Sequence, residues 1–408
     1  MVRRRVVRPA PAVPREVRHL AIDRRLFDGS DAHASREGAS AFVSITEAAV
    51  ARVTPLSADL DRHDAFPTEA IDHFRECGLL KGPLPMAAGG VGLCEPEQVA
   101  ALREVLYLVG RGSLVLGRLY EGHVNALALV LRYGSAESRE HFAQDARDGH
   151  LFGVWNTEPD PGGLSLMQAD GVMQLGGMKS YASGAGYVTR PLVTARTEDD
   201  RRLMLVAPLE PGTRSDATAW RVHGMRATAT GTVEFSGLRI DTEAVIGEPD
   251  DYFRQPFFSC GAWRFLAVQC GGIASVFEAH RAHLLKTGRG GDPHQRARLG
   301  KAAAAVETAR LFVAGAAEAA AHAEADPEGA VAYVNLARGV VERAGLDVIE
   351  LAQRSVGLSG FLEAHPLERR VRDLATYLRQ PAPDYALASA AGHILDAPGP
   401  FHALWQRP

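Results

Sequence analysis

Apolar residues follow two different patterns in three successive regions of the chain, and each pattern predicts a different kind of element. Between residues 36 and 150 they recur every three or four positions, which indicates helices with one buried face. Between residues 151 and 248 they form short alternating runs bounded by Gly and Thr, which is typical of strands. From residue 249 onward the helical spacing returns. These patterns predict an α+β multi-domain protein with an N-terminal helical domain, a middle β-barrel or sandwich domain and a C-terminal helical bundle.

Helix boundaries can be predicted from proline and glycine. Pro67 suits the first turn of a helix and Gly78 suits its end, and a Pro/Gly loop follows over residues 83–92. Longer helices are expected over 95–109 and 113–133. The C-terminal region is expected to form helices over 257–285, 294–325, 328–355, 367–378 and 385–395.

Composition narrows the classes of partner. The formal net charge of the chain is -4, which favours neither a nucleic-acid partner nor an anionic membrane. The sequence has no uninterrupted apolar run long enough to span a bilayer. Residues 1–35 are predicted to be a disordered basic tail, since the Arg-rich start lacks the apolar segment of a signal peptide. The four cysteines are scattered, so no metal site is predicted and reduced thiols in a cytoplasmic protein are expected.

One segment, residues 151–186, combines aromatic and hydroxyl side chains in a way that points to chemistry. Trp155, Asn156 and Thr157 precede a Glu-Pro turn, and Tyr181 and Ser183 follow on a second extended run after Gly-rich turns. Aromatic rings beside short hydroxyl groups suit a flat ligand with a polar edge. The pattern therefore predicts that the two runs lie together around such a ligand.

Several short motifs, in order along the chain, resemble the acyl-CoA dehydrogenase superfamily. The resemblance covers nearly the whole chain from about residue 40. The matching motifs are Phe66-Pro67, Cys77-Gly78-Leu79, residues 89–93 (GGVGL), Thr157-Glu158-Pro159, residues 179–184 (KSYASG), residues 224–228 (GMRAT), Val233-Glu234-Phe235, Ile246-Gly247, residues 353–361 (QRSVGLSGF), residues 365–369 (HPLER) and Arg372-Asp373.

The resemblance implies a flavoprotein oxidoreductase that holds FAD between the β domain and the C-terminal bundle. It places one group of residues near the flavin ring: Trp155, Asn156, Thr157, Tyr181 and Ser183. It places Arg289 near the pyrophosphate, and it places Gln353 and Gly357 in the segment that approaches the adenine end bound by a partner subunit.

The same resemblance implies partners. It predicts a homodimer or homotetramer, because a neighbouring subunit closes the cofactor site in this superfamily. It implies an acyl-CoA or another acyl-thioester substrate, oxidised at its CH-CH group. The electron acceptor is expected to be an electron-transfer flavoprotein or oxygen, and a monooxygenase of this fold would need a flavin reductase instead.

The sequence departs from the superfamily at the catalytic base. Ordinary members use a Glu shortly after the Arg-Asp pair to remove the proton alpha to the thioester carbonyl. Here that position falls on or near Pro381, and no Glu follows Asp373. The second position used by some members corresponds to Trp263, beside Arg264. Neither position carries a carboxylate, so ordinary acyl-CoA dehydrogenation is in doubt.

Two residues are candidate replacements for the missing base. Asp384 lies within a turn of the vacant position, although it also suits the N-cap of the last helix. On the helix from Ser113, Glu121 and His123 are two residues apart, so only one of them can face the pocket. We expect it to be His123, because a histidine can take a proton from a hydroxyl-bearing substrate or donate one. A polar histidine on the helix surface is the alternative.

Three functions are consistent with the sequence. The first is an FAD-dependent oxidoreductase acting on an acyl thioester. The second is a flavin-dependent monooxygenase of the same fold, which uses reduced flavin and oxygen. The third is a flavin-binding relative with a degenerate active site. The missing Glu favours the second and third over the first.

Overall fold

The computed structural model describes residues 32–160, 162–169, 171–401 and 404–405. Most of the predicted basic tail, residues 1–31, lies outside the described residues. Helix α1 begins at Ala32, so the predicted start of the N-terminal domain at residue 36 falls inside this helix.

The N-terminal domain is helical, as its apolar spacing predicts. Its helices are α1 (Ala32–Val53), α2 (Ser57–Arg62), α3 (Thr68–Glu76), α4 (Val99–Gly112), α5 (Leu114–Tyr133) and α6 (Ala136–Arg147). Gly78 has a φ of 77°, which explains why a glycine ends the turn after α3. Ser113 caps α5, since its side chain accepts a hydrogen bond from the Leu116 amide.

The middle domain consists of two sheets. The strands are β1 (Phe152–Trp155), β2 (Ser165–Ala169), β3 (Val172–Gly176), β4 (Met178–Ala182), β5 (Arg190–Arg196), β6 (Arg202–Val206), β7 (Ser215–Asp216), β8 (Gly231–Glu234), β9 (Arg239–Ile240) and β10 (Val245–Ile246). One sheet has the order β10-β6-β5-β2-β3-β9, and β1 pairs in parallel with β5. The other sheet has the order β4-β8-β7. A two-sheet domain agrees with the predicted sandwich.

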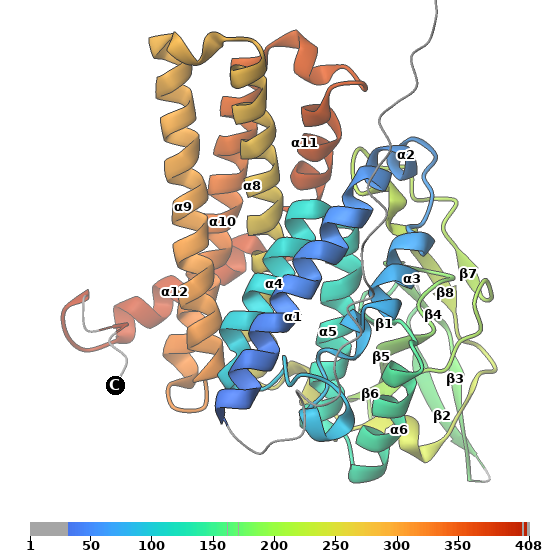
Figure 1. The fold of residues 1–408 in the computed structure, drawn as a ribbon. Coiled ribbons are helices and arrows are strands. Elements are labelled where there is room, and N and C mark those ends of the chain that lie inside the picture. Colours follow the sequence, from blue (N-terminus) through green and yellow to red (C-terminus); the bar gives the residue numbers. More distant parts are fainter. Residues whose placement is uncertain (1–31, 161, 170, 402–403, 406–408) are drawn as a thin grey trace, which may run out of the picture.

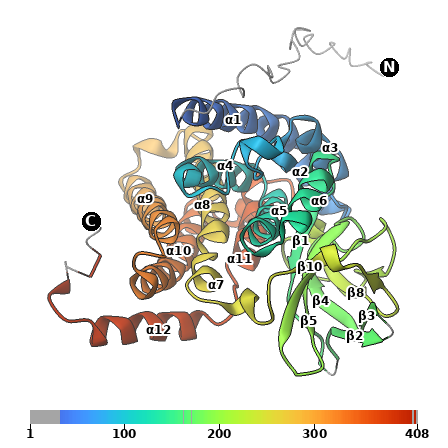
Figure 2. The same cartoon turned by 90° about the horizontal axis from the view of Figure 1, so that it is seen from below.

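The C-terminal region is a helical bundle with one helix that leaves it. Its helices are α7 (Phe257–Cys260), α8 (Trp263–Lys286), α9 (Pro293–Ala321), α10 (Pro327–Val356), α11 (Pro366–Tyr377) and α12 (Pro383–Asp396). Helices α8, α9 and α10 run side by side, whereas α12 projects sideways from the foot of the bundle (Figures 1 and 2). The β domain lies against the other side of the molecule.

Helix α5 is the element through which the three regions meet. It packs against α4, α6 and α8 and against β1 of the β domain, and it runs through the centre of the molecule when the fold is seen from below (Figure 2). Helices α4 and α8 also cross closely, because a Cβ on Gly110 would lie 2.2 Å from the Val268 carbonyl oxygen. Side chains on α5 can therefore reach both the β domain and the bundle.

Two helical segments, Leu114–Tyr133 and Phe257–Lys286, are long and apolar enough to cross a membrane. In each case 72% of the apolar window is buried inside the fold. Their apolar residues are thus used in packing against other helices, as in a core helix of a globular domain.

Candidate functional site

Two polar residues on α5, Glu121 and His123, point in different directions. Glu121 faces Arg118 and Asn125 on the same helix. His123 faces the loop after α3 and strand β1, where its Nε2 donates to the Leu80 carbonyl at 2.6 Å and its Nδ1 accepts from the Phe152 amide at 3.1 Å. Backbone groups therefore occupy both ring nitrogens of His123, and the geometry favours Glu121 rather than His123 as the residue on the site.

Burial lowers the pKa of His123 to about 4, because the fully enclosed ring cannot be charged cheaply. Its folded-state pKa thus lies below the ordinary value of 6.5, so its contribution to stability is present at pH 7 and is lost as the pH falls from about 6.5 to 4.

We therefore expect the difference in unfolding free energy between the wild type and His123→Gln to be largest at pH 7. As the pH falls to 4, this difference should decrease by up to roughly 3 kcal/mol, because protonation of the His123 ring destabilises only the wild type. Urea unfolding at several pH values measures the difference. His280 is another buried histidine with a lowered pKa, and it also makes stability depend on pH. Because both proteins contain His280, its contribution cancels in the difference between them. A difference that does not change with pH would contradict this assignment.

A continuous chain of hydrogen bonds joins the β domain to the bundle through α5. Arg118 Nε donates to Ser183 Oγ at 3.3 Å, and Arg118 Nη1 donates to Glu121 Oε2 at 2.9 Å. The other Glu121 oxygen accepts from the Asn125 amide, and Asn125 Oδ1 accepts from Arg264 Nη1 at 3.3 Å. We call these five residues the polar chain. It begins at a residue expected beside the flavin and ends on α8.

The polar chain lies in a desolvated environment. Burial alone would lower the pKa of Arg118, but the adjacent Glu121 carboxylate raises it above its usual value and keeps the guanidinium charged. Burial lowers the pKa of Arg264. Two phenols lie nearby, and burial raises the pKa of Tyr252 to about 12 and that of Tyr377 further. Both phenols are therefore neutral at pH 7 and can serve as hydrogen-bond donors.

The two extended runs of the candidate site come together as expected. Trp155 Nε1 donates to the Ser183 carbonyl at 3.0 Å, and the Ser180 amide donates to the Thr157 carbonyl at 2.9 Å. Thr157 and Tyr181 are exposed, with Tyr181 68% accessible, and Ser183 is half-buried. These three residues form an accessible rim beside the end of the polar chain.

The Trp155 ring and the Asn156 amide are turned into the β domain, although the Trp155 Nε1–H still contacts the rim at the Ser183 carbonyl. The Trp155 ring is 2% exposed and packs edge-on against Phe235, inside the β domain. Asn156 Oδ1 accepts from Thr194 within the buried cluster around Lys179. Trp155 lies beside Ser183, so its place near the flavin stays a prediction, but the enclosed ring presents no exposed face for stacking on a ligand. The sequence could not show whether the Trp155 ring faces the ligand or the interior of the β domain. Alternation along a strand shows which residues share a face, but not which face is buried.

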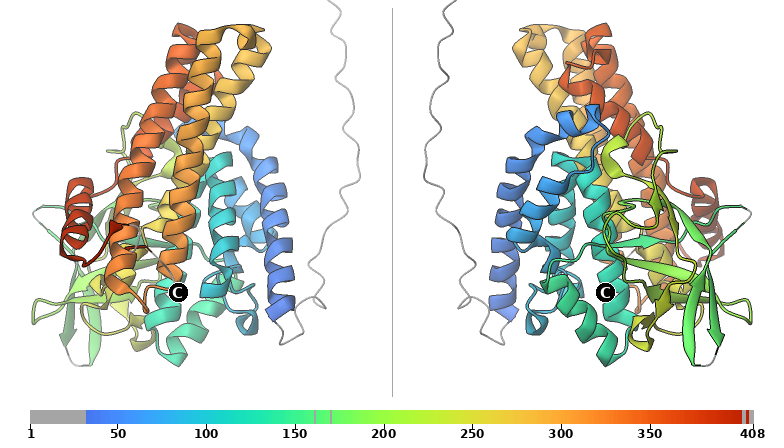
Figure 3. Two further views of the ribbon diagram at one scale, coloured as in Figure 1. Left: turned by 90° about the vertical axis from the view of Figure 1, so that its left-hand side faces the viewer. Right: turned by 90° about the vertical axis from the view of Figure 1, so that its right-hand side faces the viewer.

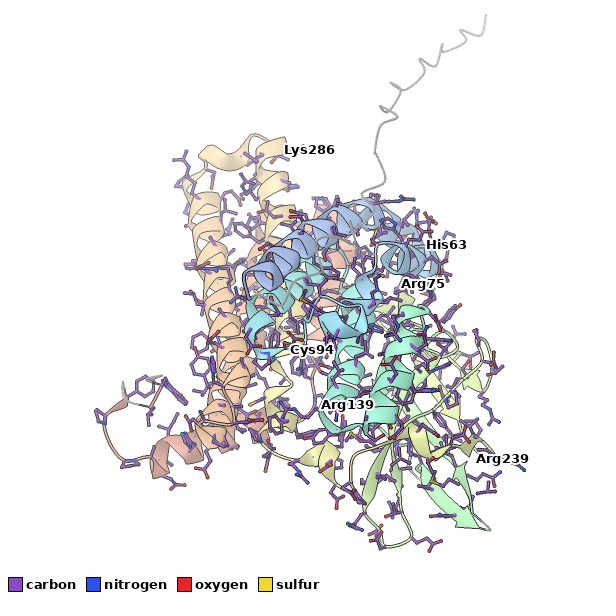
Figure 4. All side chains as sticks on the ribbon, turned by 60° about the horizontal axis from the view of Figure 1, so that its bottom comes forward. His63, Arg75, Cys94, Arg139, Arg239 and Lys286 are labelled. Atoms are coloured by element: carbon purple, nitrogen blue, oxygen red, sulfur yellow. The ribbon has the colours of Figure 1, made fainter. Side chains whose placement is uncertain are left out.

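Three other expected cofactor residues lie together at the opposite end of the bundle. Arg289 follows α8 and donates through Nη1 to the Ser355 carbonyl at 3.3 Å. Gln353 lies in the last turn of α10, which ends at Val356, and Gly357 is the C-cap with a φ of 76°. Lys286, the last residue of α8, lies at one end of the bundle, far from Arg239, which belongs to the β domain (Figure 4). One chain therefore cannot bring these residues to Tyr181 and Ser183.

The structure places no carboxylate at either usual position of the superfamily's base. Pro381 is exposed in the turn before α12, and Trp263 is a buried residue at the start of α8. Asp384 is exposed in the first turn of α12, where a carboxylate suits the positive end of the helix. It is not the N-cap, which is Ala382. In the single chain, Asp384 thus points to solvent rather than to the polar chain.

Sequence analysis missed Arg118, Asn125 and Tyr377, and it considered Arg264 only as a neighbour of Trp263. One signal was present, because Arg118, Glu121 and Asn125 recur at intervals of three and four and share a face of an otherwise apolar helix. A polar stripe on a buried helix indicates a site.

Models of one family match most of the helical parts of the chain. The acyl-CoA dehydrogenase N-terminal domain matches residues 39–150, and the acyl-CoA dehydrogenase C-terminal domain matches residues 278–379. These two matches flank the β domain and agree with the resemblance of the spaced motifs.

Individual relatives include monooxygenases, nitrososynthases and acyl-CoA dehydrogenases. A dibenzothiophene monooxygenase of Rhodococcus erythropolis is 27% identical over 203 residues, which span 47% of this chain and 48% of the relative, so the match covers about half its length. A mitochondrial short-chain specific acyl-CoA dehydrogenase of Rattus norvegicus is 25% identical over 84% of this chain and 86% of the relative. The solved structure of TdsC from Paenibacillus sp. A11-2 with FMN and indole has a TM-score of 0.78 at 20% identity, covering 90% of this chain and 99% of that one.

Proposed function

Since the chain belongs to the acyl-CoA dehydrogenase superfamily, we propose that it is a flavin-dependent monooxygenase of that fold, using reduced flavin and oxygen on a substrate that is not an acyl-CoA. The similarity to a dibenzothiophene monooxygenase and to an FMN complex of the same fold supports this activity. Acyl-thioester oxidation by an FAD enzyme is the second candidate, supported by the match to a short-chain dehydrogenase. An amino sugar nitrososynthase matches over a similar length, so match length does not separate the two candidates.

One observation carries the choice between the two. Dehydrogenation needs a carboxylate that is free to remove a proton from carbon, and neither usual position has one. Glu121 is the nearest buried carboxylate, but both of its oxygens are engaged by Arg118 and Asn125. Neither oxygen is therefore free to take a proton from carbon, whereas an oxygenase needs only groups that orient the substrate and move a proton to or from oxygen.

The rim of Thr157, Tyr181 and Ser183 fits the edge of a flavin ring. Tyr181 offers an exposed aromatic face, and its φ of 51° turns the backbone at the end of β4. The Ser183 hydroxyl accepts from Arg118 and Thr230, which leaves its oxygen held in one place. Reduced flavin would supply the electrons that activate oxygen. Arg118 and Ser183 would orient and hydrogen-bond the groups that gather at that edge.

A second copy of the chain would complete the cofactor site. Large apolar residues are exposed beside the other cofactor candidates and along the protruding helix α12, and they include Leu358, Phe361, Leu362, Tyr385 and Leu395. Such residues on adjoining surfaces are typical of an interface between subunits. In a homodimer or homotetramer, Arg289, Gln353 and Gly357 would serve the partner's cofactor, and they would be needed for FAD rather than FMN because they lie at the adenine end.

An oxygen electrode separates the two activities. With a flavin reductase, NADH and FMN or FAD, we expect oxygen uptake that depends on this protein and increases with a substrate. With flavin-loaded protein under anaerobic conditions, butanoyl-CoA and octanoyl-CoA should leave the oxidised flavin band unchanged. Bleaching of that band by either acyl-CoA would support the dehydrogenase and count against the proposal.

A further inference from the structure

Arg264 differs from the other buried cations around the site because it has no carboxylate of its own. Arg118 pairs with Glu121, Arg372 with Asp61 and Lys179 with Glu158. Among the described residues, Arg264 takes part in no ion pair within 4 Å. The polar chain therefore contains two guanidinium groups and one carboxylate, and the carboxylate is already engaged by Arg118.

The hydrogen bonds of Arg264 are equally incomplete. A guanidinium has five N–H donors. Arg264 Nη1 reaches Asn125 Oδ1 at a long 3.3 Å, and the buried Nε makes no hydrogen bond within the described part of the chain. A buried charge with unsatisfied donors costs several kcal/mol unless a partner arrives. A ligand that carries an oxyanion would supply the missing partner.

The neighbouring groups do not pair with Arg264. The Glu121 carboxylate lies close enough to raise the pKa of Arg264, but its ion pair is with Arg118. Cys94 and Cys260 lie close enough to interact with it, but burial raises the pKa of Cys94 to about 11 and that of Cys260 to about 12, so both thiols are neutral at pH 7. Arg132 adds a like charge nearby. The Arg264 guanidinium also lies 5.4 Å from the Trp263 ring, a contact that leaves its N–H edge free for an anion.

We propose that Arg264 binds an oxyanion of the substrate, so that this site takes a small carboxylate or a chemically equivalent anion. The inference rests on the proposed function, which places the reacting part of the substrate towards Ser183. The anionic part of the substrate would then lie at the α8 end of the polar chain. The Arg118 side chain is 30% exposed, so the polar chain is accessible to solvent at its Ser183 end, beside the rim. A neutral thioester carbonyl does not match a guanidinium that requires a counter-ion.

Binding of simple carboxylates in the absence of flavin tests this inference separately from oxygenation. The probes are benzoate and propanoate, each compared with its neutral amide, benzamide and propanamide, and the readout is the tryptophan fluorescence of the full chain, which includes Trp263. We expect at least one carboxylate to bind about tenfold or more tightly than its amide. The preference should vanish in Arg264→Gln and survive partly in Arg264→Lys.

Arg281→Gln is the matched control, because Arg281 lies on the same helix but is 55% exposed. It should keep the full preference for the carboxylate. Unfolding temperatures check that the variants are folded, and Arg264→Gln should be at least as stable as the wild type, since it removes an uncompensated charge. Equal binding of acid and amide, or a preference that persists in Arg264→Gln, would overturn the inference. Oxygen uptake with reduced flavin would be unaffected by that result.

Discussion

Replacing Arg372 by glutamine is expected to lower the free energy of unfolding by about 3–5 kcal/mol, because it leaves two carboxylates buried without their partner. Arg372 Nη2 lies 2.6 Å from Asp61 Oδ2, and its Nε lies 2.5 Å from Glu368 Oε1. Its Nη1 also donates to the His223 carbonyl at 2.9 Å. One side chain on α11 thus joins α2 and the loop between β7 and β8 of the β domain to the bundle. Urea unfolding measures the loss.

The control is Arg310→Gln on α9, which removes an exposed pair with Glu307. Its effect should stay within about 0.5 kcal/mol, because solvent screens both charges. A similar small effect for Arg372→Gln would show that the buried network adds nothing to the docking of α11.

Replacing Arg118 by methionine should affect both stability and activity. Glu121 is 2% exposed, so the variant leaves a buried carboxylate with only Asn125 beside it, at a cost of about 3 kcal/mol. Substrate-dependent oxygen uptake should fall about a hundredfold, because the orienting group between Ser183 and Glu121 is lost.

The double variant Arg118→Met/Glu121→Gln separates the two effects. Removing the carboxylate together with its partner should restore most of the stability, because neither charge is then left unpaired. Oxygen uptake should stay low, since the guanidinium is still absent. If the double variant regained full activity, the polar chain would be a structural feature of α5 and α8 rather than part of the active site.

Much of the fold could be predicted from the sequence, because the spacing of apolar residues and the residues that begin or end helices indicate the same elements. The spacing of apolar residues fixed the nature of each region, and residues such as Ser113 and Gly78 marked helix ends that the structure confirms. The predicted starts of α9 and α10 are each one residue late, because Asp292 and Asp326 are the N-caps and a proline follows each of them as the first helical residue.

The candidate site was harder to predict, because it depends on which face of an element points inward. The interval between Glu121 and His123 showed that only one could face the site, yet only tertiary packing shows that His123 bonds to the backbone of Leu80 and Phe152. In the same way, Trp155 and Tyr181 are both aromatic residues on strands, but one is enclosed and the other exposed. Arg264 could not be recognised as unpaired from sequence, because its possible partners come from other helices.

The most direct test of the central claim compares the binding of reduced and oxidised flavin to the purified protein under anaerobic conditions. Reduced FMN or FAD should bind at least tenfold more tightly than the oxidised form, and Ser183→Ala should weaken binding of the reduced form. Tight binding of oxidised FAD, with no preference for the reduced form, would contradict the proposed monooxygenase activity and would favour an FAD-dependent dehydrogenase instead.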